Sequence, residues 1–292
     1  MVGSAVCRRL QSEQCEVLTA DRSALDLRVQ SDVDVWIASN KPDAIVIAAA
    51  KVGGIGANAA QPAAFFYDNM MITAHILHAA YMHGIERVLV LGSSCIYPRE
   101  CAQPITEEML LSGLLEPTNE AYALAKIGGL KMAQYYRQQY GCDFISAMPC
   151  NLYGVGDRYD EQDSHVIPAL MMRAHAAKLR GDTQLVVWGS GQALREFLYV
   201  DDLAEALVTM LVHYQGDGHI NIGSGEEISI GDLARLICDV VGFDGEIVFD
   251  TSKPDGTPRK ILDNRHIHDL GWRAKTSLTV GLEKCYADFL NR

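Results

Sequence analysis

The sequence is poor in positive charge and lacks the patterns that mark metal sites and membrane segments. It holds 25 Lys and Arg against 37 Asp and Glu, and the net charge of −12 argues against a nucleic-acid surface and against an anionic membrane. Its eight cysteines show neither C-x-x-C nor Cys/His ligand spacing, so we expect no metal site. No N-terminal signal and no apolar span of about 20 residues is seen, which predicts a cytoplasmic protein with reduced thiols.

What the sequence does contain is an alternation of strand-like and helix-like segments. With 49% hydrophobic residues in 292, the chain can bury the core of one large domain and a smaller lobe. In the first half, apolar periodicity predicts helices at 1–10, 33–40, 62–83 and 122–141 and strands at 15–20, 43–50, 87–92 and 143–148. The strand at 43–50 is expected to be buried on both faces. This order predicts an α/β fold with a doubly wound parallel (Rossmann) sheet.

After residue 155 the predicted elements become shorter. Helices are expected at 164–180, 202–214 and 229–241 and again before residue 290, with strands at 184–188, 196–200, 219–222 and 246–249. We therefore predict a dinucleotide-binding domain over 1–154, to which later segments contribute, and a substrate-binding lobe over 155–292. The lobe should close over the carboxyl edge of the sheet, where open α/β sheets bind ligands.

The start of the chain departs from this plan. In a dinucleotide-binding fold a strand and a glycine-rich turn precede the first helix, because the amides of the turn hold the pyrophosphate. Here a helix comes first, and only Gly3 stands where such a turn would end. Taken alone, Gly3 is a plain helix-entry glycine. In context we interpret it as the last glycine of a fingerprint whose first strand is missing, and we expect this form to be poorly soluble and to bind the dinucleotide weakly.

Tyr122 and Lys126 stand four residues apart in a run of good helix formers, so their side chains should share one helix face. A positive neighbour stabilises a phenolate, and we expect Lys126 to lower the pKa of Tyr122 and make it a general acid. Ser93 follows the strand at 87–92 and can hold a substrate carbonyl. Together the three predict a hydride-transfer site. The plain alternatives are a solvated lysine and a strand-end cap.

These three residues and the strands around them resemble the extended short-chain dehydrogenase/reductase family. Six longer segments carry the resemblance across nearly the whole chain: 50–55, 91–98, 116–120, 151–154, 164–170 and 253–260. They are similar to members of the family that act on GDP-4-keto-6-deoxy-D-mannose. The resemblance implies a homodimer that inverts C3 and C5 of this GDP-sugar and then reduces its C4 ketone with NADPH.

Inversion of a carbon beside the ketone needs one group to remove a proton and another to deliver one to the opposite face. The resemblance implies that Cys95 and His165 do this work. A thiol and an imidazole have reference pKa values of about 8.5 and 6.5, near enough to neutrality for both roles. Taken singly, Cys95 would be a small core residue and His165 a surface or capping residue.

The resemblance also implies which residues contact the cofactor. They are Gly3, Arg22, Leu91, Gly92, Ser93, Ser94, Tyr122, Lys126, Pro149, Cys150, Asn151, Leu152 and His165. Arg22 is in a place where a guanidinium can pair with the 2′-phosphate that distinguishes NADP from NAD. Asp21 beside it would instead favour the free 2′-hydroxyl of NAD, so NADP is favoured without NAD being excluded.

On the substrate side, the resemblance implies contacts from Arg173, Trp188, Arg195 and Asp255. Arginine supplies forked donors for a diphosphate, and tryptophan supplies an apolar wall with one donor. Without the resemblance, each would be an exposed arginine or a packed tryptophan. Two other functions stay open: a nucleotide-sugar epimerase or dehydratase that holds NAD tightly, and a nucleotide-binding relic without turnover.

Overall fold

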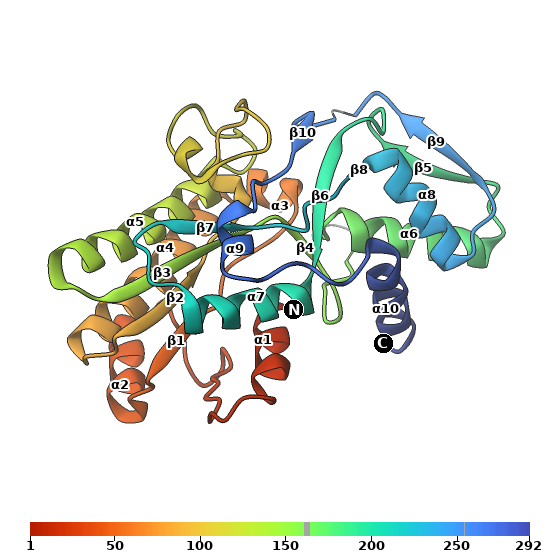
Figure 1. Cartoon of the computed structure of the whole chain (residues 1–292). Coiled ribbons are helices and arrows are strands. Elements are labelled where there is room, and N and C mark those ends of the chain that lie inside the picture. The colour runs from red at the N-terminus through yellow and green to blue at the C-terminus, as the bar shows by residue number, and fades with distance from the viewer. Residues whose placement is uncertain (161–163, 254) are drawn as a thin grey trace.

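Four parallel strands form the central sheet of the computed structural model, which describes residues 1–160, 164–253 and 255–292 (Figure 1). The strands lie in the order β1-β2-β3-β7. Their bounds are Ala44–Ile47 (β1), Arg87–Leu91 (β2), Asp143–Pro149 (β3) and His219–Ile222 (β7). β7 comes from the second half of the chain and pairs with β3, so both halves contribute to one sheet.

Helices cover both faces of this sheet because successive strand residues point to opposite sides. Val88 and Leu89, neighbours in β2, belong to two different hydrophobic cores. The core around Val88 includes α2 and α4, and the core around Leu89 includes α1 and α7, while α5 packs along α4. These helices span Gln30–Asn40 (α2), Pro62–Met82 (α4), Val2–Leu10 (α1), Val200–His213 (α7) and Glu120–Tyr140 (α5). The predicted doubly wound α/β fold is confirmed.

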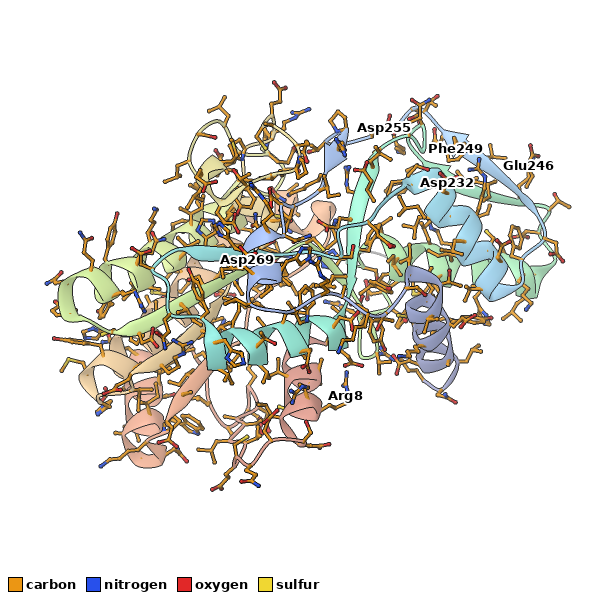
Figure 2. All side chains as sticks on the ribbon, in the orientation of Figure 1. Arg8, Asp232, Glu246, Phe249, Asp255 and Asp269 are labelled. Carbon is orange, nitrogen blue, oxygen red and sulfur yellow. The ribbon has the colours of Figure 1, made fainter. Side chains whose placement is uncertain are left out.

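The first helix is joined to α7 by packing and by charge. Ala5 and Val6 of α1 are buried in the core that α7 shares. Arg8, which Figure 2 labels on α1, pairs with Asp201 of α7. Because this pair is largely exposed, it contributes about 1 kcal/mol or less. The buried apolar contact is therefore the main link between the two helices.

The second lobe has a hydrophobic core of its own, to the right of the first in Figure 1. Three helices surround it: α6 (Val166–Arg180), α8 (Ile230–Val241) and α10 (Leu278–Leu290). Two parallel strands lie on it, β5 (Gln184–Trp188) and β9 (Glu246–Asp250). A further small sheet joins β4 (Asn151–Tyr153), β6 (Leu194–Tyr199), β8 (Glu227–Ser229) and β10 (Arg259–Lys260). Four short helical turns complete the described elements: α3 (Ile55–Ala60), η1 (Ser94–Ile96), η2 (Glu107–Met109) and α9 (Arg265–Asp269).

Two strand predictions are wrong in detail. Residues 15–20 form no strand, because a strand needs a neighbour for its hydrogen bonds and no described residue pairs with them. The strand predicted at 43–50 is only Ala44–Ile47, and it is not buried on both faces. It lies at the edge of the sheet with β2 as its partner, and Ala44 is exposed.

The other predicted helices and strands are present within a few residues of their expected ends. The structure adds the short strands β4, β8 and β10, which lack a sequence pattern of their own. The division into domains at 154 and 155 stays a prediction. Pro254, in the segment 253–260 quoted above, lies outside the described residues. Within the described part of the chain, no helix is long and apolar enough to cross a membrane, and no group of three or more His, Cys, Asp or Glu could hold a metal.

Candidate active site

The carboxyl ends of β2 and β3 build one wall of the site. Gly92 donates its N–H to the Ala147 carbonyl at 2.8 Å, so the strand pairing continues until Ser93 emerges at the sheet edge. A Cβ on Gly92 would lie 2.1 Å from Met148 Sδ, which is buried. Glycine therefore allows the close approach of the two strands here. Ser93 therefore lies at the carboxyl edge of the sheet, where open α/β sheets bind ligands.

Ser93 organises the turn that follows β2. It is the N-cap of η1, and its Oγ accepts the N–H of Cys95 at 3.3 Å. Its hydroxyl also hydrogen-bonds the phenol of Tyr122. The strand-end cap considered for Ser93 is therefore present, and the same side chain reaches the predicted acid. The structure brings Ser93, Cys95 and Tyr122 into one cluster.

The ionisation of Tyr122 differs from the prediction. Burial raises the pKa of Tyr122 well above its ordinary value, negative charge at Cys95 raises it further, and the hydrogen bond from Ser93 opposes both effects. The expectation that Lys126 lowers this pKa is wrong for this structure. The Lys126 Nζ lies 5.8 Å from the centre of the Tyr122 ring, and burial rather than this ammonium has the largest effect on the pKa of the phenol. Tyr122 thus holds its proton firmly.

Lys126 is one of the few buried charges of the chain, with 5% of its surface exposed. Its Nζ donates to the carbonyl of Leu91 at 2.9 Å, which fixes the ammonium at the end of β2. Burial lowers the pKa of Lys126 to about 8. An ammonium has three donors, so two N–H groups are left for other acceptors. The predicted helix-face pair of Tyr122 and Lys126 is present on α5.

The thiol of Cys95 is partly exposed and has a partner that the sequence did not suggest. Asn119 donates from its Nδ2 to Cys95 Sγ at 3.2 Å. Asn119 is the N-cap of α5, three residues before Tyr122. The cluster therefore contains a thiol held by an amide next to a phenol held by a hydroxyl.

His165 lies at the start of α6, as its N-cap, and is exposed. Its carbonyl accepts the N–H of Ala169 at 3.0 Å. Among the described residues, no hydrogen bond joins His165 to Cys95 or Tyr122. Its charged neighbour is Asp157, whose pKa is raised by burial and drawn back down in part by His165. The pairing of His165 with Cys95 in proton transfer stays a prediction.

The other predicted cofactor contacts lie mostly along the carboxyl edge of the sheet. Ser94 and Cys150 are buried, and Cys150 donates its N–H to the Ile222 carbonyl at 3.0 Å. Leu91, Pro149, Asn151 and Leu152 flank them at the ends of β2 and β3 and in β4. Gly3 is in α1, where a Cβ would lie 3.8 Å from Ala48 Cβ, beyond the end of β1. Gly3 therefore lies near the same edge of the sheet, but a larger side chain would not clash there, so the position does not require glycine.

Arg22 and Asp21 lie in an exposed turn and differ in what they contact. The Asp21 carboxylate accepts the hydroxyl of Ser23 and the N–H groups of Ala24 and Ser23, the last two at 3.1 and 2.8 Å, and these bonds keep its pKa low. No hydrogen bond from the Arg22 guanidinium is found within the described residues. The Asp21 carboxylate is therefore already hydrogen-bonded within its own turn, whereas the exposed Arg22 is available to bind an anion.

The second lobe brings the four predicted substrate contacts close to one another. Trp188 is 65% exposed, and the Arg173 guanidinium lies 6.0 Å from its ring centre. Asp255, labelled in Figure 2, accepts the N–H of Ser190 at 2.6 Å, two residues after Trp188. Burial lowers the pKa of Arg195, and the charge of Asp255 opposes this effect. The group therefore combines an exposed ring beside Arg173 with a partly buried Arg195 beside Asp255.

Two residues of these clusters were missed from the sequence. Lys253, which follows β9, has its Nζ 5.6 Å from the Trp188 ring centre. Asn119 contacts Cys95 across 24 positions of the chain. A lysine in a loop and an asparagine at a helix start are ordinary solvated or capping residues in a sequence. Their roles depend on contacts that have no periodic signal.

The fold and this cluster define a class of protein. The family described as the NAD dependent epimerase/dehydratase family has a model that matches residues 1–223, and the chain belongs to this family. The resemblance carried by Ser93, Tyr122 and Lys126 is thereby confirmed.

Within this family the chain is similar over its whole length to GDP-L-fucose synthases. The synthase of Sinorhizobium fredii is 56% identical over 291 residues, covering 100% of this chain and 93% of that protein. The synthase of Escherichia coli is 47% identical over 300 residues, covering 99% and 94%. A solved GDP-L-fucose synthetase from Naegleria fowleri, bound to NADP, has a TM-score of 0.92 at 31% identity and covers 99% of this chain and 91% of that one.

Proposed function

We propose that this protein converts GDP-4-keto-6-deoxy-D-mannose to GDP-L-fucose by inverting C3 and C5 and reducing the C4 ketone with NADPH. The observation that carries the proposal is the cluster of Ser93, Cys95, Tyr122 and Lys126 at one strand end. It unites a thiol suited to proton removal with the residues of a ketone reductase. The relatives named GDP-L-fucose synthase support the same reaction.

For the reduction, NADPH supplies the hydride when it is bound. Ser93 donates a hydrogen bond to the C4 oxygen, and Tyr122 delivers its proton to that oxygen as negative charge develops there. Because burial raises the pKa of Tyr122, the phenol is protonated at neutral pH and gives up its proton only to a strong base. Lys126 uses the N–H groups that Leu91 leaves free to hold ribose hydroxyls.

For the inversions, Cys95 removes the proton beside the ketone, and His165 delivers one to the opposite face. Each carbon then returns to a C–H bond with the other configuration. The partly exposed thiol beside Tyr122 supports this role for Cys95. The role of His165 requires that the start of α6 faces the sugar, and its exposure supports an open approach.

The residues present fit NADP. The buried Lys126 keeps N–H groups that Leu91 does not use and that can hold ribose hydroxyls, and the exposed Arg22 offers a cation for a 2′-phosphate. Asp21 does not compete, because its carboxylate accepts two amides of its own turn. The solved relative bound to NADP supports this choice over NAD.

The GDP part of the substrate is assigned to the second lobe. Arg173 and Arg195 have pKa values lowered by burial, so their charges are incompletely solvated and gain from an anionic partner. Trp188 presents an exposed ring for a base or sugar to pack on. In a chain with a net charge of −12, such a cluster attracts a diphosphate locally.

We also propose that the protein acts as a homodimer in the cytoplasm. The packed helices α4 and α5 expose aromatic residues that a second copy could cover: Phe66, Tyr67, Tyr135 and Tyr140. All eight cysteines are free, which supports a reducing compartment. Sedimentation equilibrium tests the dimer, and Tyr135→Glu should shift the mass toward the monomer.

The reaction itself is tested with purified protein, the 4-keto sugar nucleotide and NADPH in deuterated water. We expect NADPH to be consumed in proportion to GDP-L-fucose formed, with deuterium at C3 and C5. Cys95→Ser should slow the deuterium incorporation first. An epimerase that retains NAD would invert the sugar without net consumption of NADPH, and that outcome would replace the proposal.

A further inference from the structure

Asn119 uses its side chain in an unusual way for its position. An asparagine at a helix N-cap ordinarily accepts an N–H from the first turn and so stabilises the helix. Here the side chain makes no such bond. Its Nδ2 donates to Cys95 Sγ at 3.2 Å, and its Oδ1 is buried with no partner among the described residues. The Asn119 side chain therefore contacts the Cys95 thiol instead of capping α5.

Both ends of this contact are held in place. The N–H of Asn119 donates to the Glu116 carbonyl at 3.2 Å, which fixes the backbone at the start of α5. On the other side, Ser93 Oγ accepts the N–H of Cys95. Neither side chain has to be ordered by a ligand. The amide and the thiol are therefore already arranged before substrate binds.

The contact lies between two hollows of the surface. Asn119 lines a cavity of about 300 Å³ together with Asn58, Pro62 and Pro117. Cys95 lines a second, smaller hollow with Arg99 and Arg259. The thiol is thus reachable from outside while the amide holds it from within.

We propose that Asn119 is a positioning residue that orients the Cys95 sulfur and favours its thiolate form. The inference rests on the proposed function of Cys95 as the base of the epimerisation. An N–H that donates to sulfur interacts more strongly with a thiolate than with a neutral thiol, because the bond to an ion is charge-assisted. Asn119 thereby increases the fraction of Cys95 that can remove a proton.

The step is balanced without a further reactant. The thiolate takes the proton from the carbon beside the ketone and becomes S–H, and the electron pair of the C–H bond moves to the ketone oxygen as an enolate. The Asn119 N–H loses its anionic partner at that moment, while Ser93 and Tyr122 face the oxygen that gains charge. The thiolate also keeps Tyr122 protonated, since negative charge at Cys95 raises the pKa of Tyr122.

The test compares Asn119→Ser with Thr118→Ala. Serine keeps the N-cap preference of the helix start but is too short to donate to Cys95, and Thr118 is the neighbouring residue without a contact to the thiol. The alkylation rate of Cys95 by iodoacetamide is followed against pH by peptide mass spectrometry, with the exposed Cys15 of the same chain as internal reference.

In Asn119→Ser we expect the midpoint of the alkylation profile of Cys95 to move up by about one pH unit, with the profile of Cys15 unchanged, because a charge-assisted hydrogen bond corresponds to about tenfold in equilibrium. Thr118→Ala should leave both profiles unchanged. An unmoved midpoint in Asn119→Ser, or an equal shift in Thr118→Ala, would overturn the proposal. Deuterium incorporation at C3 and C5 near neutral pH should fall about tenfold and recover at higher pH.

The two readouts separate this inference from the function on which it rests. The alkylation profile needs no substrate, so an unmoved midpoint refutes the role of Asn119 while GDP-L-fucose formation still stands. Failure of the wild-type protein to form GDP-L-fucose refutes the proposed function even if the midpoint moves.

Discussion

The two halves of the site differ in how they meet water. At the end of β2, Lys126 is 5% exposed and donates to a backbone carbonyl, and Tyr122 is held by Ser93. In the second lobe, Trp188 is 65% exposed and faces two cations. The first cluster is built of groups whose protonation matters, and the second of groups whose charge is permanent or whose surface is apolar.

The difference follows from what each cluster has to do. Proton transfer needs donors whose pKa values are set by a low dielectric and whose positions are fixed before the reaction. Binding of a soluble diphosphate needs cations that the ligand can reach and an open wall on which it can pack. The first cluster should therefore control turnover, and the second should control affinity.

The largest expected effect is on Tyr122. Tyr122→Phe removes the phenol proton that is transferred to the C4 oxygen. We therefore expect the rate of C4 reduction to fall by a factor of about 10² to 10⁴. Deuterium should still enter C3 and C5, because a different residue removes those protons. Mass spectrometry of the sugar measures the exchange, and NADPH absorbance measures the reduction. An equal loss of both would end the division of roles between Tyr122 and Cys95.

The buried charge of Lys126 should be visible in stability. Its pKa is lowered to about 8 in the folded protein from the ordinary 10.5, so the unfolded chain binds more protons between these values and the contribution of Lys126 to stability rises with pH across that window. Below about pH 8 this contribution is unfavourable by roughly 3 kcal/mol. Relative to Lys126→Met, the wild type should gain about this much between pH 8 and 10.5 in urea unfolding. Parallel curves would show that Lys126 is not desolvated.

A substitution of Arg22 tests whether an exposed cation sets the affinity for NADPH, as the second lobe is expected to set the affinity for the GDP-sugar. A charge-assisted contact with a 2′-phosphate is worth about 1.5–3 kcal/mol, or roughly 10- to 150-fold in affinity. Arg22→Ala should weaken NADPH by this factor and leave NADH nearly unchanged in a fluorescence titration. If both weaken alike, Arg22 does not select the cofactor, and Asp21 sets a preference for NAD.

The smallest expected effect concerns Lys253. A cation over an exposed ring contributes about 0.5–1 kcal/mol, so Lys253→Ala should raise the KM for the GDP-sugar by about two- to fivefold with kcat unchanged. Lys284, whose Nζ lies 5.0 Å from the Tyr199 ring centre, makes the same kind of contact and provides the matched control. A fall in kcat for Lys253→Ala would mean that the second lobe also takes part in the chemistry.

Much of the fold could be predicted because its elements carry local signals. The run at Arg87–Leu91, the helix of Tyr122 and the glycine stop at Gly141 were found from apolar periodicity and from a residue that adopts positive φ. The strand predicted at 15–20 does not form, because an apolar run becomes a strand only when a neighbour accepts its hydrogen bonds. β10 is two residues long and is defined by its pairing with β6 alone.

The sequence by itself determined the alternation of helices and strands and the residues of the reductase cluster, because spacing on a helix and position after a strand are local properties. It also determined the acidic charge of the chain. Only the tertiary structure decided the protonation of Tyr122, which burial governs and helix spacing does not. It alone joined Asn119 to Cys95, since the start of one helix meets the turn after a distant strand only when the sheet has formed.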